Sequence, residues 1–275
     1  MGTRASLGFT VIETVLFLGI TGLLVLGVLI GVGNNVNEQR YRDAAETFKS
    51  VVQSQYASVT NVQNGRSSQY VCNSVAGVVD APVGQQPGQS SCFIIGKYVR
   101  IEKGEIDSYT ILATARTGVT PTDTRDITLL KEAYTINLSR AEVESKEMEW
   151  GTEIATPVPT GSPASTATTP RSIGLLIIRS PDSGQVYTFV SNTVPTKSDI
   201  ESLNPLTPPK FLSDMLITGK TTPGQAEQIV CVESSGLFTN RQMALYIAPY
   251  ASGSSAIELV SNDTLTDRGA GVSCR

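Results

Sequence analysis

The chain has 275 residues, of which 40% are hydrophobic and 17% are charged, a composition that suits a folded body of one large or two small domains carrying one apolar segment. The formal net charge of −4 argues against general electrostatic binding to nucleic acid, while leaving a local basic patch open. Histidine is absent, which excludes Ser–His and Cys–His catalysis and zinc binding through histidine.

An uncharged apolar run covers residues 14–33, between Glu13 and the next charge, Glu38. A helix of about 20 residues spans the roughly 30 Å hydrocarbon core of a bilayer, so this run predicts a membrane helix. It is longer than the apolar part of a cleaved secretory signal peptide, and Glu13 fits that alternative badly. A permanent signal anchor with Glu13 near the membrane surface is a second alternative.

A third alternative starts from the residues before the apolar run. The short basic stretch "MGTRASLG" ends at Gly8 and is followed by "FTVIE", from Phe9 to Glu13. This pattern closely resembles the class III leader of type IV prepilins and pseudopilins. The resemblance implies that prepilin peptidase cuts between Gly8 and Phe9 and that the new Phe9 amine is N-methylated. Residues 1–8 are then the leader peptide, and residues 9–33 the transmembrane and filament-core helix.

Glu13 has a physical reason to matter in this arrangement. A carboxylate inside a membrane costs several kcal/mol unless it has a partner. Cleavage would free the amine of Phe9, and Glu13 of one subunit could accept a charge-assisted hydrogen bond from the Phe9 amine of the next. The family ties this residue to filament assembly. The alternative is a solvated Glu13 at the level of the lipid headgroups.

The following segment, residues 34–62, has apolar residues at steps of mostly three and four, which predicts an amphipathic helix that continues into the body. No proline interrupts the chain from Phe9 to Ala81, so one helix of about 50 residues, roughly 75–80 Å long, is expected. Tyr41, Phe48 and Tyr56 are expected in the core.

Residues 63–154 are expected to form a loop region and a first β-region. The stretch from 63 to 92 is rich in Gly, Ser, Gln and Asn, which indicates a long irregular loop. Two apolar segments flank Lys103-Gly104 and predict a β-hairpin. The sequence at 127–139 is ambiguous between strand and helix, and the sequence at 140–150 favours a helix.

Residues 155–171 form a Pro-, Ser- and Thr-rich segment, expected to be a mobile surface loop or a linker between lobes, with O-glycans as an option. Residues 172–275 are predicted to be a C-terminal β-rich region. It begins with a hairpin around "PDSG" at 181–184, continues through a short helix capped by Thr196 or Ser198, and ends with three strands at 227–234, 241–250 and 256–262.

The four cysteines contain no CxxC pair, which makes a zinc or thioredoxin-like site a weak interpretation. An even number of widely spaced cysteines in an exported chain favours disulfides, for which three connectivities exist. Pairing of neighbours, Cys72 with Cys92 and Cys231 with Cys274, closes the shorter loops. Four buried free thiols are the alternative. The second bond would resemble the disulfide that pins the C-terminal region of many pilins.

The sequence contains no Walker loop, no GxSxG and no HExxH motif, so we predict that the chain is not an enzyme and has no cofactor. Some pseudopilins hold calcium in a late loop. Asp263 and Asp267, or Asp123 and Asp126, are weak candidates for such a site, because neither pair has the dense oxygen spacing of a dedicated calcium loop. Solvated turn carboxylates, and no metal, are the expectation.

The predicted fold is α+β: a pilin-like lollipop with a long N-terminal helix on an antiparallel β-sheet head, with room for a second β-rich lobe. The resemblance implies a structural subunit that polymerises with itself into a helical filament, with prepilin peptidase, the membrane and the pilus assembly machinery as partners. Before assembly it would be a single-pass cytoplasmic membrane protein with an extracytoplasmic head, and afterwards part of an extracellular filament on a prokaryotic cell. The alternative is a membrane-anchored binding or adhesin domain that never polymerises.

Overall fold

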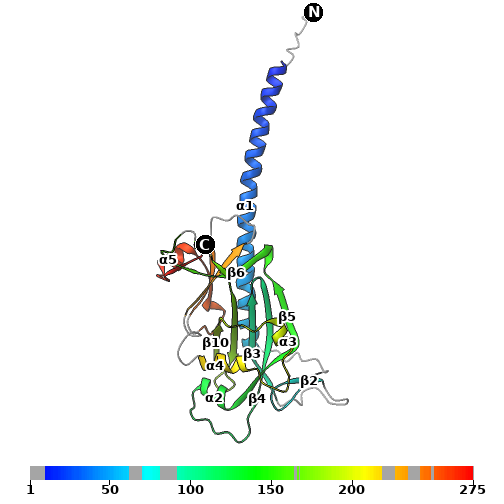
Figure 1. The fold of residues 1–275 in the computed structure, drawn as a ribbon, viewed down its shortest axis with the longest axis vertical. Helices are drawn as coiled ribbons and strands as arrows, with labels where there is room; N and C mark the ends of the chain where they lie inside the picture. The colour runs from blue at the N-terminus through cyan, green and yellow to red at the C-terminus, as the bar shows by residue number, and fades with distance from the viewer. Residues whose placement is uncertain are drawn as a thin grey trace, which may run out of the picture.

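The fold was analysed in a computed structural model that describes residues 10–61, 70–80, 92–163, 166, 168–218, 227–234, 242–248 and 251–274. The protein is α+β, with one long N-terminal helix and antiparallel sheets. In Figure 1 the first half of the helix projects from the β-rich body, and its second half runs into that body.

Helix α1 (Val11–Thr60) is a single 50-residue element, as its uninterrupted sequence predicts. At 1.5 Å per residue it is about 75 Å long. Its second half presents an apolar stripe that is fully buried and includes Tyr41, Phe48 and Tyr56, so the predicted core role of these aromatic residues is confirmed.

The first five-stranded sheet has the order β10-β9-β3-β4-β5 and is antiparallel throughout. Its strands are β3 (Phe93–Glu102), β4 (Glu105–Ala115), β5 (Tyr134–Glu147), β9 (Ser172–Arg179) and β10 (Val186–Ser191). The β3–β4 and β9–β10 hairpins lie where the sequence predicts them. Gly96 is needed where β3 meets β9, because a Cβ there would stand 2.1 Å from the carbonyl oxygen of Ile177.

The second five-stranded sheet has the order β13-β12-β11-β6-β8. Its strands are β6 (Thr152–Thr156), β8 (Thr169–Pro170), β11 (Gln228–Ser234), β12 (Met243–Ile247) and β13 (Ile257–Ser261). The last three are the predicted C-terminal strands. Two small sheets pair β1 (Tyr70–Cys72) with β2 (Val78–Asp80), and β7 (Val158–Pro159) with β14 (Val272–Ser273).

One core joins α1 to both large sheets. Buried residues of α1 pack together with Val99 and Leu175 of the first sheet and with Val230 and Leu245 of the second. The far face of the first sheet is covered by α2 (Asp126–Glu132), α3 (Lys197–Glu201) and α4 (Lys210–Thr218). The far face of the second sheet carries α5 (Asn262–Asp267), and two short 3-10 turns lie at Glu149–Gly151 and Ser254–Ala256.

Residues 155–171 do not separate the strands of the two large sheets along the chain. Strands β9 and β10 follow that segment in the chain but join the first sheet beside β3, whereas β6 precedes most of it and lies in the second sheet beside β11. The sheets therefore share one core instead of forming consecutive lobes. The segment itself is not simply a mobile loop, because Ala155 and Val158 are buried in β6 and β7.

Two further local predictions are corrected. The predicted helix at 140–150 is mostly the second half of the edge strand β5, where Glu144 to Glu147 pair with Ser108 to Glu105 of β4. The backbone hydrogen bonds to β4 outweigh the helix propensity of Glu, Lys and Ala in this stretch. Charged side chains are also common on exposed edge strands, where they oppose pairing with other chains. The expected irregular loop at 63–92 contains the β1–β2 pair in its described part. Helix α4 was not predicted.

Candidate functional site

The first half of α1 is an apolar surface on which none of the described residues packs. Its large apolar side chains are exposed, with exposed fractions between 51% at Ile20 and 80% at Val11. The helix is long and apolar enough to cross a membrane, and none of its most apolar stretch is buried against the body. A surface of this size requires lipid or apolar protein as its partner, because single exposed apolar residues are common in proteins but a continuous apolar helix in water is not.

The two threonines of this half satisfy their hydroxyl groups within the helix. Thr14 Oγ1 donates to the carbonyl of Val11 at 2.8 Å, and Thr21 Oγ1 donates to the carbonyl of Phe17 at 2.7 Å. Polar groups in hydrocarbon need internal partners of this kind. Glu13 is then the one charged side chain between Thr10 and Asn37 in the sequence.

Glu13 closes a capping box at the start of α1. The Glu13 backbone N–H donates to Thr10 Oγ1 at 3.4 Å, while the Thr10 backbone N–H and hydroxyl donate to Glu13 Oε2 at 3.1 and 3.0 Å. Two otherwise orphaned donors of the helix terminus are satisfied in this way, and the carboxylate complements the positive end of the helix dipole. Among the described residues, Oε1 of Glu13 accepts no hydrogen bond.

The other two residues of the predicted N-terminal site, Gly8 and Phe9, lie outside the described residues, so cleavage and methylation there remain predictions. The capping role of Thr10 was not predicted from the sequence. The sequence does contain a signal for this cap. A Thr at position 10 and a Glu at position 13, directly before an apolar run, have the spacing of a capping box.

Buried tyrosine hydroxyls fix the second half of α1 to the sheets. Tyr41 Oη donates to the carbonyl of Val232 on β11 at 2.7 Å and accepts from the N–H of Met243 on β12 at 2.8 Å. Tyr56 Oη lies 3.0 Å from Thr188 Oγ1 on β10. Burial raises the pKa of both tyrosines to about 12. The helix is thus held in position and rotation by contacts with both sheets.

The four cysteines form the two predicted pairs, Cys72 with Cys92 and Cys231 with Cys274. The first bond joins β1 to the start of β3. The second joins β11 to the C-terminal segment after β14, which ties the end of the chain to the second sheet. Both bonds belong to the body, so neither touches the projecting half of α1.

The acidic residues that the sequence offered for calcium do not gather into a site. Asp263 and Asp267 lie in the first and last turns of α5, and in the described part of the chain no three His, Cys, Asp or Glu side chains come together in a metal-binding group. Asp126 accepts hydrogen bonds from Ser183 and from Tyr187, the latter at 2.9 Å, which lower the pKa of its carboxyl. Asp123 forms an ion pair with Arg125.

No protein-family model, curated protein or solved structure matches the chain. Three features of the structure bear on its function. They are the exposed apolar half of α1, the cap formed by Thr10 and Glu13, and the anchoring of the same helix in the body.

Proposed function

We propose that the protein is a structural subunit of a type IV pilus or pseudopilus-like filament, cut by prepilin peptidase after Gly8 and polymerised through the first half of α1. The observation that carries the proposal is the division of one continuous helix into an anchored half and an exposed apolar half. A cleaved signal peptide has no need to be continuous with a helix buried in the body. A helix that moves from lipid into a filament core needs this continuity.

Assembly would replace lipid around α1 with the helices of neighbouring subunits. Glycines at 19, 22, 27, 31 and 33 have open space where a Cβ would stand, and small residues of this kind permit close approach between helices. Because the cap uses Oε2 of Glu13, Oε1 is available to accept a charge-assisted hydrogen bond from the Phe9 amine of another subunit. The filament would serve adhesion, twitching motility, secretion or DNA uptake.

The proposal is tested first by the mature N-terminus. The full chain is expressed with and without an active prepilin peptidase, and the purified protein is analysed by mass spectrometry. We expect a start at N-methylated Phe9 only with the peptidase. Gly8→Leu, which enlarges the residue at the cut site, should block cleavage, and Gly2→Leu is the matched control. A Met1 start in the presence of peptidase that cuts a control prepilin would contradict the proposal.

The role of Glu13 needs a separate experiment. Glu13→Ala should leave cleavage intact and reduce the amount of chain in sheared filaments, because the subunit loses its acceptor for the incoming amine. Glu38→Ala is the matched control, since Glu38 forms an ion pair with Arg42 on an exposed part of α1. A filament yield for Glu13→Ala equal to that of Glu38→Ala would contradict the hypothesis that Glu13 pairs with the Phe9 amine of another subunit. Filaments that never form with any cleaved variant would favour the non-polymerising anchored domain.

A further inference from the structure

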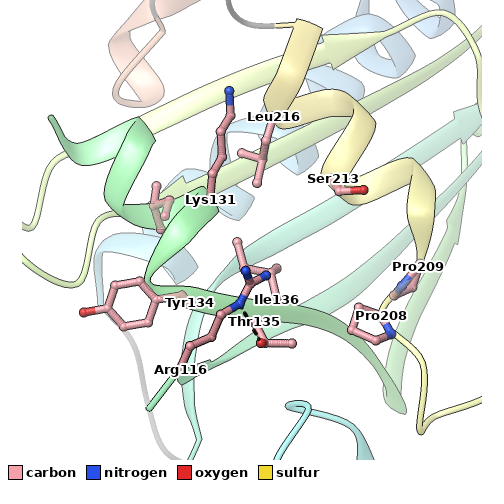
Figure 2. A pocket seen from close by; sticks show the side chains of 10 residues that line it. Arg116, Lys131, Tyr134, Thr135, Ile136, Pro208, Pro209, Ser213 and Leu216 are labelled. Carbon is pink, nitrogen blue, oxygen red and sulfur yellow. Dashed lines mark hydrogen bonds between the residues drawn. The ribbon is translucent and has the colours of Figure 1, made fainter. Parts of the chain in front are cut away.

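A partly enclosed cavity lies between α2, α4 and the start of β5 (Figure 2). Helices α2 and α4 lie at the end of the body remote from the projecting half of α1 (Figure 1). Its volume is about 190 Å³. An apolar cavity of about 150 Å³ is large enough to hold a benzene molecule, so this cavity suits a single ring or a branched alkyl group.

The floor of the cavity is apolar. Leu130 of α2, Ile136 of β5 and Leu216 of α4 are 0%, 9% and 3% exposed. Pro208 and Pro209 close one side immediately before α4, as Figure 2 shows. A ligand that filled this space would exchange water for carbon contacts on most of its surface.

The rim of the cavity is cationic. Arg116 and Lys131 both line it, and none of the described residues that line it is acidic. The two acidic residues of α2 have hydrogen-bond partners of their own: the Glu132 carboxylate accepts from the Thr122 backbone N–H at 2.6 Å, and the Asp126 carboxylate accepts from the Tyr187 hydroxyl. An anionic group at the rim therefore meets favourable charge and no carboxylate of the lining.

Arg116 is held in a position to bind an anion. Its backbone N–H donates to the carbonyl of Ala133 at 2.8 Å, and its Nε donates to Thr135 Oγ1 at 3.1 Å, a bond drawn in Figure 2. Among the described residues, the two terminal guanidinium nitrogens have no hydrogen bond and no ion pair. A guanidinium fixed through Nε presents the remaining donors to a carboxylate with little further loss of side-chain freedom.

We propose that this cavity binds a small carboxylate whose body is one ring or one branched alkyl group, with the apolar body on Leu130, Ile136 and Leu216 and the carboxylate on Arg116. The site belongs to the body and does not depend on whether the chain forms filaments. Its place at the far end of the body keeps it clear of the membrane-spanning part of α1.

The test uses the full chain in nanodiscs of zwitterionic lipid, with the methyl groups of Ile136 and Leu216 observed by NMR. Phenylacetate is the probe, phenylacetamide is its neutral match and acetate lacks the ring. We expect phenylacetate to shift both methyl signals and to bind about tenfold more tightly than phenylacetamide, because only phenylacetate can accept a charge-assisted hydrogen bond with both partners ionised; tenfold corresponds to about 1.4 kcal/mol. Acetate should cause no saturable shift.

Arg116→Gln should lower the affinity for phenylacetate about tenfold and leave the affinity for phenylacetamide unchanged. The preference for the charged ligand is then abolished. Arg268→Gln is the matched control, because Arg268 pairs with Glu258 at the edge of the other sheet. Equal binding of phenylacetate and phenylacetamide to the unmodified chain would overturn the proposal, as would signals of Ile136 and Leu216 that do not move at saturating phenylacetate. Both of these outcomes are measured without any variant.

Discussion

The two halves of α1 have the same backbone and opposite surroundings. Tyr41, Phe48 and Tyr56 in the second half are at most 1% exposed, whereas Phe17 in the first half is 65% exposed. The difference lies in which side chains have partners in the same chain. The second half stabilises the body, and the first half leaves its apolar surface exposed; in the proposed filament that surface passes from lipid to other subunits. One continuous helix thus stabilises the body through its second half and presents a surface for attachment through its first half.

The largest contrast should come from truncating a phenylalanine in each half. Phe48→Ala opens a cavity in the core shared by α1 and the sheets, and should lower the free energy of unfolding of the body by about 3–5 kcal/mol. Phe17→Ala should leave it unchanged within about 0.5 kcal/mol, because Phe17 touches nothing in the body. Denaturant unfolding of the full chain in neutral detergent measures both. Similar losses for the two variants would contradict the division of the helix.

The disulfide at the end of the chain should stabilise the body by a similar or slightly smaller amount. Cys231 and Cys274 are separated by 43 positions, and replacing both by alanine should cost about 4 kcal/mol on a chain-entropy estimate. The measurement is the unfolding free energy of the double variant against the unmodified chain under oxidising conditions. Cleavage after Gly8 should proceed as before, since the bond is remote from α1's first half. A double variant as stable as the unmodified chain would show that the bond does not restrain the body.

The anchored half should also make stability fall at high pH. The unfolded state ionises its tyrosines near pH 10, whereas burial raises the pKa of Tyr41 and of Tyr56 to about 12. The folded state therefore holds protons that the unfolded state loses, so stability is complete below pH 10 and falls as the pH rises towards 12, by about 2–3 kcal/mol per tyrosine. Tyr56→Phe should flatten this fall in unfolding measured from pH 8 to 12. If the stability of Tyr56→Phe fell with pH as steeply as that of the unmodified chain, the raised pKa of Tyr56 would be contradicted.

The smallest effect is expected at the exposed end of the helix. Thr10→Ala removes the hydroxyl that accepts from Glu13 N–H, and the loss of an N-cap costs about 1 kcal/mol. The first turn of α1 should exchange its amide hydrogens about fivefold faster, measured by hydrogen exchange in nanodiscs, while the body stays protected. Thr14→Ala is the control, because the Thr14 side chain caps no helix. Equal exchange in both variants would remove the capping role.

The sequence was sufficient for features with local or strongly periodic signals. The 50-residue helix follows from an unbroken apolar pattern without proline, and the hairpins follow from turn residues between apolar segments. The disulfide pairs followed from spacing. The cap at Thr10 also has a local signature of four residues, from Thr10 to Glu13, in which Glu13 is both an isolated charge and a capping group.

What could not be predicted depends on contacts between distant segments. Nothing near Ser172 indicates that β9 joins β3, more than seventy residues earlier, since that choice is made by the shared core with α1. The charged half of β5 has the composition of a helix, but it forms a strand because its backbone pairs with that of β4. The cavity above Ile136 is formed by residues from α2, β5 and α4 and from the segments that follow β4 and precede α4, and no single stretch of sequence carries its signal.

The central claim is that the exposed half of α1 contacts other copies of the chain. A photo-cross-linking amino acid at Leu24, which is 65% exposed, tests it directly in cells that contain the peptidase and assembly machinery. The same residue at Lys210, exposed on α4, serves as the comparison position. We predict a ladder of cross-linked multimers from position 24 that disappears when the peptidase is inactive. A cleaved chain that remains monomeric after irradiation at position 24 would contradict the account.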